Sequence, residues 1–453
     1  MAGAKRKSHE MDMCTGPILS KMLVFAIPLM LSSILQLLFN AADVIVVGRF
    51  AGDNALAAVG STSSLVNLFV NFFMGLSIGA NVLVARFYGA KQERALKETV
   101  HTAITISLIS GVVLAIVGVF ASPIILTWMD APAEVLPLAA TYLRVYFLGM
   151  PALMLYNFGA AILRAIGDTK RPLIYLSVAG VINVTLNLVF VIVFKWSVFG
   201  VALATTLSQI VSALLVLRCL VKEESSIHVD IKSLGINKDK IKKILQIGLP
   251  AGLQSVLFSF SNVLIQSSVN SFGATVVAGN SAAANIEGFA YVAMNAFYQS
   301  NLSFTSQNFG AGKYKRIDHI LLVGQGCVIV VGLLAGGACY LFGPQLLTLY
   351  TTSEKVILAG MVRLSFIGLP YALCGIMDVM VGSLRGLGYT VFPMIVSLIG
   401  SCGLRIIWLQ TIFRMDQFHQ IEIVYIIYPI TWIVTGLAHF ITYMVVRRKF
   451  IKK

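Results

Sequence analysis

The chain has 453 residues, of which 58% are hydrophobic and only 12% are charged. This is too little polar surface to cover a soluble globule of that size, so the composition indicates an integral membrane protein. The net charge of +15 does not indicate a nucleic-acid partner, because the basic residues gather at the termini and in every second loop between apolar segments, as membrane topology requires.

Apolar segments of about twenty residues recur along the chain, and helices satisfy their own backbone hydrogen bonds inside hydrocarbon. The sequence therefore predicts an all-α integral membrane fold with twelve transmembrane helices. In chain order they are 22–47, 56–85, 102–121, 135–163, 172–193, 199–220, 244–269, 276–301, 320–342, 356–381, 392–413 and 421–446.

The distribution of Lys and Arg predicts the orientation of the chain. By the positive-inside rule both termini are cytoplasmic, which requires an even number of crossings of the cell membrane. The leader has no short apolar core followed by a cleavage site, so we interpret it as a cytoplasmic tail rather than a signal peptide.

The chain repeats itself at an offset of about 220 residues. The segment RVYFLGMP, which ends at Pro151, corresponds to RLSFIGLP, which ends at Pro370. Each copy holds six predicted helices, so we expect two parallel-repeat bundles that rock against each other around a site near their interface. The expected parts are a tail (1–20), an N-terminal lobe (21–221), a cytoplasmic linker (222–243), a C-terminal lobe (244–446) and a basic tail (447–453).

Four motifs carry a resemblance to a known family. RFYGAKQ from Arg86 and LRAIGDTKRP from Leu163, with their second-half partners QNFGAGK from Gln307 and LRGLGYT from Leu384, resemble the multidrug and toxic compound extrusion (MATE) family. The resemblance implies twelve helices in two lobes around a central cavity. It also implies antiport of cationic or amphipathic compounds against protons or sodium. We further expect a monomer that is not an enzyme and needs no cofactor or metal.

An acidic residue, Asp43, lies inside the first predicted span, and ionisable groups in the bilayer usually mark functional sites. Gln36, Asn40 and Asp43 are spaced to share one helix face, as are Asn183 and Asn187 in the fifth span. The helical rise places Asp43 about 9 Å and Asn187 about 12 Å below the outer surface. The cluster is either a polar contact between helices or a switch at which a proton and a cationic substrate compete.

In the resembling family, a first-helix Asp and two fifth-helix polar residues form a cation site, which maps onto Asp43, Asn183 and Asn187. A sixth-helix hydroxyl, Thr205 or Thr206, is the expected further member. Many members carry Asp where this chain has Asn187, and the loss of that charge favours protons over sodium. The second-half position that corresponds to Asp43 is apolar, so we expect coupling in the N-terminal lobe alone.

The eighth predicted span carries a polar and aromatic stripe. Glu287 heads it, and an unpaired acid beside tyrosines suits a cationic aromatic ligand. A methionine would add a soft, adaptable wall. The candidates for the substrate cavity are therefore Glu287, Tyr291, Asn295, Tyr298 and Met154.

Other residues are candidates for gates or lobe contacts. Glu287 has a second interpretation, a buried ion pair with a mid-membrane arginine of the eleventh span, Arg405. Prolines inside spans permit bends, and the arginines of the two LR–G motifs are interpreted as cytoplasmic hinges. The gating and contact candidates are Pro28, Arg164, Asp378, Arg385 and Arg405.

Two other functions would require different sequence features. A lipid-linked saccharide flippase of the same superfamily would favour a strongly cationic cavity for a pyrophosphate, and Arg405 is the one arginine expected well inside the membrane. A membrane enzyme would require clustered histidines, carboxylates or a nucleophile with its base, whereas the six histidines are dispersed. Small amphipathic molecules and the lipid bilayer are the expected partners.

Overall fold

The computed structural model describes residues 10–129 and 132–451. The outer ends of both expected cytoplasmic tails, residues 1–9 and 452–453, lie outside the described part of the chain. Every regular element in the described ranges is a helix, and the all-α fold is confirmed.

The helices form two compact units. The first unit holds the chain up to Asp12 and Leu31–Gly248, and the second holds Met13–Met30 and Leu249–Lys453. Two helices, α1 (Ile18–Phe50) and α8 (Lys238–Asn270), therefore pass from one unit into the other.

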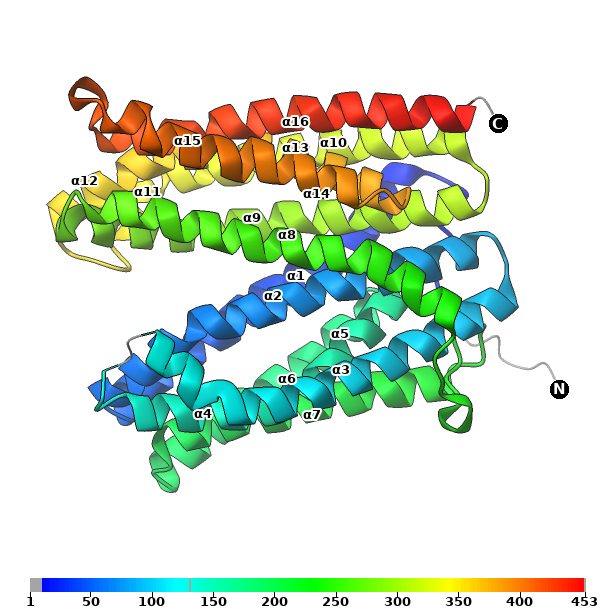
Figure 1. Ribbon diagram of the computed structural model, residues 1–453, viewed down its shortest axis with the longest axis horizontal. Coiled ribbons are helices and arrows are strands. Elements are labelled where there is room, and N and C mark those ends of the chain that lie inside the picture. The colour runs from blue at the N-terminus through cyan, green and yellow to red at the C-terminus, as the bar shows by residue number, and fades with distance from the viewer. Residues whose placement is uncertain (1–9, 130–131, 452–453) are drawn as a thin grey trace. The chain divides into compact units, whose positions relative to one another are not determined.

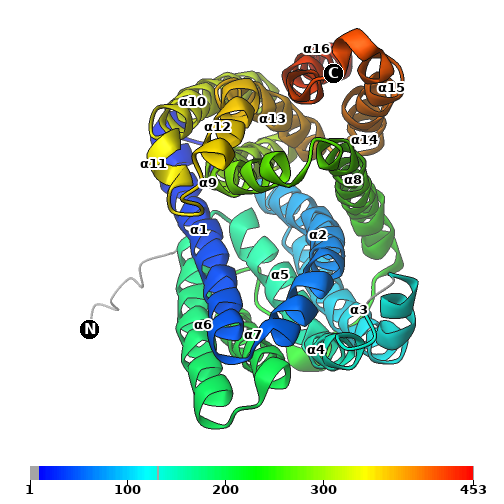
Figure 2. The same cartoon turned by 90° about the vertical axis from the view of Figure 1, so that its left-hand side faces the viewer.

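In the first unit, α3 packs on α4 and α5, while α7 packs on α4, α5 and α6. Figure 2 shows α6 and α7 side by side, in agreement with their many contacts. The elements of this unit after α1 are α2 (Asp53–Gly89), α3 (Glu93–Trp128), α4 (Leu136–Leu148), α5 (Met150–Ala165), α6 (Lys170–Leu188), a π-helical turn (Val189–Val193), α7 (Ser197–Lys222) and a 3₁₀ turn (Ile231–Ser233).

In the second unit, α9 packs on α10, α12 and α13, and α13 also packs on α16. Figure 1 draws the part of this unit that follows Gly248 from green to red, and its segment Met13–Met30 in blue. Its elements after α8 are α9 (Ala274–Gly310), α10 (Tyr314–Leu341), α11 (Gly343–Leu347), α12 (Glu354–Arg363), a π-helical turn (Leu364–Gly368), α13 (Ala372–Gly386), α14 (Val391–Ser397), a second π-helical turn (Leu398–Gly403), α15 (Leu404–Gln410), 3₁₀ turns at Ile412–Arg414 and Asp416–Phe418, and α16 (Ile421–Ile451).

The twelve predicted spans correspond to these helices. Within the described residues, nine helices are long and apolar enough to cross a membrane, and two bent pairs raise this number to eleven. The predicted span 276–301 falls in α9, a helix of 37 residues whose buried side chains include many Ser, Asn, Thr and Gln residues. The twelve-helix membrane fold is consistent with this arrangement.

Two predicted spans are bent. The span 135–163 is α4 followed by α5, with an angle of 47° between them, and the span 356–381 is α12 and α13, with an angle of 43°. Pro151 is the second residue of α5, and Pro370 lies in the break before α13. Proline lacks the N–H that a continuing helix needs, so the bends occur where the sequence predicts them.

The backbone also repeats. Gly52 and Gly273 precede α2 and α9 with φ of 87° and 88°, and Gly167 and Gly388 follow α5 and α13 with φ of 92° and 90°. Glycine adopts this left-handed region without the penalty that a Cβ imposes. The positions are separated by the same offset of about 220 residues as the sequence motifs, which supports the internal repeat.

The unit boundaries differ from the expected lobes at the first helix of each repeat. The early part of α8 packs on α2 in the first unit, because Gly79 and Gly248 leave room for backbone contact: a Cβ on Gly79 would lie 2.2 Å from the Ile244 carbonyl oxygen. In the second unit, the early part of α1 packs on α9 through an edge-to-face contact of Phe25 and Phe304, with ring centroids 5.8 Å apart.

Candidate functional site

A chain of polar side chains in the first unit begins at Asp43. The Asn187 amide nitrogen donates to Asp43 Oδ1 and, at 3.3 Å, to Asn183 Oδ1. Asn183 Nδ2 in turn donates to Thr205 Oγ1 at 3.2 Å. The structure thus brings together four of the residues that the sequence placed in a cation site, from α1, α6 and α7. Thr206 instead donates to the carbonyl of Val145, at 3.0 Å.

The cluster contains a buried acceptor oxygen that has no hydrogen-bond partner among the described residues. Asn187 is fully buried and Asn183 is 5% exposed, and Asn187 Oδ1 has no hydrogen-bond partner in the described residues. The ion pairs described in this unit involve other carboxylates, those of Glu98, Asp168 and Glu223. The described partners of the Asp43 carboxylate are therefore a neutral amide and a neutral hydroxyl, those of Asn187 and Thr205, which leaves the site suited to a proton or a small cation.

Two tyrosines of α4 lie near this carboxylate and were missed by the sequence analysis. Tyr142 and Tyr146 stack with ring centroids 6.2 Å apart, and both interact electrostatically with Asp43. Their spacing, i and i+4 in a predicted span, places them on one helix face. That spacing was the available signal.

Gln36 and Asn40 do not join the cluster. Both are exposed, and the face of α1 that meets α6 carries Phe39 and Asp43 instead. The Phe39 ring lies over Gly180, where a Cβ would be 1.8 Å from Cε2. The missing side chain at Gly180 lets this ring approach α6, which fixes the rotation of α1 and turns Gln36 and Asn40 away.

A second polar cluster surrounds Glu287 in the second unit. Arg363 Nε lies 3.2 Å from each Glu287 carboxylate oxygen, and its Nη2 donates to Oε2 at 2.8 Å. Arg363 Nη1 donates to Asn280 Oδ1 at 2.7 Å, and that oxygen also accepts from the Tyr425 hydroxyl at 3.2 Å. The expected pair of Glu287 with Arg405 is wrong, because Arg363 occupies the carboxylate.

Arg363 was missed, although the sequence held a signal for it. It is the arginine of RLSFIGLP and lies eight residues after Lys355, about 12 Å along a helix. Its side chain is 11% exposed. Arg405 is therefore not the only arginine expected inside the membrane. The charge of Arg363 is neutralised by Glu287.

The stripe that begins at Glu287 does not act as one surface. Tyr298 is 8% exposed and accepts a hydrogen bond from Arg385 Nη1 at 2.6 Å. Asn295 accepts from Gln299 Nε2 at 2.9 Å. Tyr291 is 38% exposed and interacts electrostatically with Asp378. Within the stripe, Tyr291 is thus the candidate with the most accessible side chain.

The remaining candidates lie in different parts of the two units. Met154 in α5 is fully buried and fills the core of the first unit, so it lines no accessible wall. Arg385 is 6% exposed and also donates to Gln254 Oε1 at 2.8 Å, so it joins α8, α9 and α13 rather than a surface loop. Pro28 lies inside the early part of α1, and Arg164 lies in the last turn of α5.

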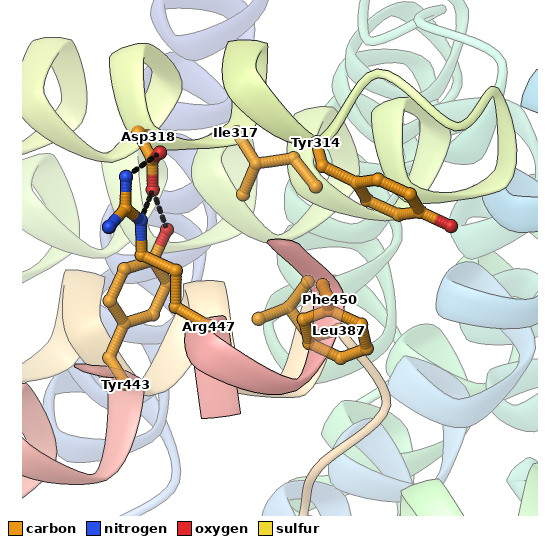
Figure 3. Close-up of a pocket in the computed structure, with 7 residues that line it drawn as sticks. All are labelled: Tyr314, Ile317, Asp318, Leu387, Tyr443, Arg447 and Phe450. Carbon is orange, nitrogen blue, oxygen red and sulfur yellow. Dashed lines mark hydrogen bonds and ion pairs between the residues drawn. The ribbon is translucent and has the colours of Figure 1, made fainter. Parts of the chain in front are cut away.

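A small open pocket lies at the ends of α10, α13 and α16 (Figure 3). Asp318 accepts from Arg447 Nε and from the Tyr443 hydroxyl, at 2.7 and 3.0 Å. Its charges are thus paired internally, and it contains none of the predicted site residues. Within the described residues, no group of three or more His, Cys, Asp or Glu side chains gathers as metal ligands.

Comparison with known proteins identifies the family. A model of the MatE family matches residues 28–189 and 250–409, one range in each repeat. The chain belongs to the MatE family. Members of this family are multi-pass membrane transporters rather than enzymes, so MatE membership makes this chain a member of a multidrug efflux transporter family.

Relatives and solved structures agree with the MatE assignment. The chain is 28% identical to the probable multidrug resistance protein YoeA of Bacillus subtilis, over 94% of both chains. It is 23% identical to the multidrug export protein MepA of Staphylococcus aureus, over 75% of both chains. The crystal structure titled MATE in complex with MaL6 has a TM-score of 0.91 at 24% identity, over 99% of this chain and 100% of that chain; this likeness shows the MatE fold.

Proposed function

We propose that this protein is a secondary antiporter of the cell membrane that exports cationic or amphipathic small molecules in exchange for protons. The observation that carries the proposal is the Asp43 carboxylate, which lies inside an apolar helix long enough to span a membrane and has neutral described partners, the amide of Asn187 and the hydroxyl of Thr205. The names of the relatives YoeA and MepA, which are multidrug resistance and export proteins, support the class of substrate.

The proposed coupling follows from competition at one carboxylate. A protonated Asp43 donates a hydrogen bond and carries no charge, whereas an ionised Asp43 attracts a cationic substrate. If the two states favour different access, binding of a proton from outside releases the substrate, and loss of that proton inside restores the cation site. The two units, each built mostly from one repeat, are the expected moving bodies of alternating access.

Protons rank ahead of sodium because of the donor set around Asp43. A sodium ion needs several oxygen ligands. Here the available ligands are the Asp43 carboxylate and Asn187 Oδ1, which has no hydrogen-bond partner among the described residues. A proton needs a single acceptor oxygen. Sodium coupling stays as the alternative, which the addition of a second carboxylate at position 187 tests.

The decisive experiment is efflux from proteoliposomes under an imposed proton or sodium gradient. We expect the wild type to respond to the pH gradient and Asp43→Asn to lose that response, since the amide cannot exchange a proton. Asp53→Asn is the matched control, because Asp53 is an exposed acid in the first turn of α2. If Asp43→Asn responds to the pH gradient as strongly as the wild type, the proposal is refuted.

The proposed orientation has its own test. Both termini are expected in the cytoplasm, together with the basic loops that follow α2 and α9. A cysteine is substituted for Lys91 or Lys313, which are both exposed. An impermeant maleimide should then label it only after the cells are permeabilised. Labelling of intact cells at either position would contradict the topology.

A further inference from the structure

A charged residue, Arg144, lies on the exposed side of α4, inside the predicted span 135–163. Successive residues of a helix turn by about 100°. Arg144 therefore lies on the side of α4 opposite Tyr142 and Tyr146, the two tyrosines that interact with Asp43. Its side chain belongs to the surface of the first unit and not to the Asp43 cluster.

The surface around Arg144 is apolar. Leu148, one turn later on the same face of α4, is exposed. Figure 2 shows α3 beside α4, in agreement with their contacts, and the exposed side chains of α3 include Ile116 and Phe120. Because α3 is apolar and long enough to cross a membrane, we expect this surface to face lipid.

One N–H of the Arg144 guanidinium has a structural role. Its Nε donates to the carbonyl of Val119 in α3, at 3.3 Å. In a regular helix that carbonyl accepts from the residue four positions later, but here that residue is Pro123, which has no N–H. Arg144 supplies the missing donor and joins α4 to α3. A neutral amide could do the same, so this contact explains a donor at position 144 but not a charge.

The charge of Arg144 has no counter-charge in the described part of the chain. The cations of the ion pairs described in the first unit are Arg94, Arg171 and Lys240. The hydrogen bond described for Arg144 uses Nε and leaves its Nη atoms as free donors. A guanidinium stays protonated in proteins, and a charge without a partner is costly inside a membrane. An anion from outside the chain would complete this site.

The second repeat shows the same arginine with an acid supplied by the protein. Arg144 begins the motif RVYFLGMP, and Arg363 begins the corresponding RLSFIGLP. Arg363 pairs with Glu287, the fourteenth residue of α9. The fourteenth residue of α2, a helix of the same length, is Val66. The first repeat thus keeps the arginine but lacks the acid.

Two helices give similar depths for the guanidinium. Arg144 lies eight residues after the start of α4, about 12 Å along the helix. Val119 lies nine residues before Trp128, the last residue of α3, which is about 13 Å. Trp128 is exposed, as an interfacial anchor should be. Side chains tilt toward the N-terminus of their helix, which for α4 is the expected outer side, so the long Arg144 side chain can extend toward the headgroups.

We propose that Arg144 binds the phosphate of an anionic phospholipid of the phosphatidylglycerol type in the outer leaflet. A guanidinium matches a phosphate group with two parallel N–H···O bonds. An anionic headgroup neutralises Arg144, whereas a zwitterionic headgroup brings a second positive charge to the site. This inference concerns the lipid-facing surface of the first unit, and it does not depend on the proposed export function.

The first test counts bound lipids by native mass spectrometry. The protein is released from detergent micelles that contain equal amounts of phosphatidylglycerol and phosphatidylcholine. Arg144→Gln and Arg144→Lys both keep a donor for the Val119 carbonyl, but only Arg144→Lys keeps the charge. Arg49→Gln is the control, because Arg49 is an exposed arginine at the end of α1. We expect Arg144→Gln alone to retain less phosphatidylglycerol, with an affinity about fivefold lower, as the loss of one basic residue at a membrane predicts.

The second test shows where the lipid binds. Leu148→Trp places a fluorophore one turn from Arg144, and the difference between its emission and that of the parent chain reports the new indole. The variant is reconstituted in vesicles of phosphatidylcholine with either brominated phosphatidylglycerol or brominated phosphatidylcholine as quencher. We expect stronger quenching by the brominated phosphatidylglycerol. Adding Arg144→Gln to the same chain should make the two quenchers equal.

Three results would overturn the assignment. The first is retention of phosphatidylglycerol by Arg144→Gln equal to that of the wild type, and the second is equal quenching by both lipids while Arg144 is present. The third is a wild-type dimer that retains no phosphatidylglycerol and that Arg144→Gln dissociates, which means that a second copy of the chain meets the charge. Thermal unfolding in detergent checks each variant. If Arg144→Gln does not fold, the comparison of the two quenchers with Arg144 intact still decides.

Discussion

Arg363 holds both carboxylate oxygens of Glu287, at distances of 2.8 to 3.2 Å, and so ties α12 to α9 within the second unit. The guanidinium also binds Asn280 Oδ1. Glu287 was predicted as a possible substrate ligand, but its carboxylate is already paired with Arg363 of the same protein. Its role in the described structure is to join helices.

We predict that breaking this pair from either side destabilises the protein. Glu287→Gln or Arg363→Gln leaves the opposite charge buried, which costs about 3–5 kcal/mol. The double substitution removes both charges and should recover much of that loss. Thermal unfolding in detergent measures all three variants, with Glu354→Gln as a control at an exposed acid. Single variants as stable as the wild type would show that the two residues do not form an ion pair.

We predict that Asn187→Asp shifts the ion preference of the transporter. The substitution places a second carboxylate beside Asp43, and two carboxylates provide a better oxygen cage for sodium. Efflux driven by a sodium gradient should rise relative to efflux driven by a pH gradient, whereas Asn187→Leu should weaken both. Asn81→Asp is the control variant, because the Asn81 amide lies apart from Asp43 and donates to the backbone carbonyl of Ala161 at 2.8 Å. If Asn187→Asp keeps the wild-type preference, the donor-set argument is wrong.

We predict that Gly79→Ala lowers stability. A Cβ at this position would lie 2.2 Å from the carbonyl oxygen of Ile244, so α2 and α8 must separate at a cost of about 1–3 kcal/mol. Gly60 lies in the same helix with open space around its Cβ position. Gly60→Ala should therefore be neutral or stabilising by up to about 1 kcal/mol. Equal melting temperatures for both variants would contradict the close approach.

We predict that Arg316 holds the segment Met13–Gly16 on the second unit. Arg316 Nη2 donates to the carbonyls of Thr15 and Gly16, at 3.1 and 2.7 Å. Hydrogen exchange of the peptide that contains this segment should become faster in Arg316→Gln, because two carbonyl contacts are lost. The exposed neighbour Lys315 is the control, and Lys315→Gln should exchange as the wild type does. Unchanged exchange in Arg316→Gln would refute the predicted contact.

Depth in the membrane could be predicted from the sequence, because the helical rise is nearly constant. Counting residues from the outer surface was enough to bring Asp43 and Asn187 to similar depths, and the structure joins them by a hydrogen bond. Rotation about the helix axis was harder to predict. Gln36 and Asn40 turn away because Gly180 admits the ring of Phe39 at that face.

The partner of Glu287 also depended on rotation. A π-helical turn at Leu398–Gly403 lies just before Arg405, and another at Leu364–Gly368 follows directly after Arg363. A π-helical turn inserts a residue, which rotates the side chains on either side of it relative to a regular helix. No straight-helix count could therefore decide between Arg363 and Arg405.

By itself, the sequence determined that this is a twelve-helix membrane protein with an internal repeat, because apolar length, basic loops and repeated Pro and Gly motifs are local properties of the chain. Only the tertiary structure decided which charges are paired. It joined Glu287 to Arg363, left Arg405 with Thr431 and Tyr428, and divided α1 and α8 between the two units. Pairing depends on which helix faces meet, and that is set by bends and small residues distant in the chain.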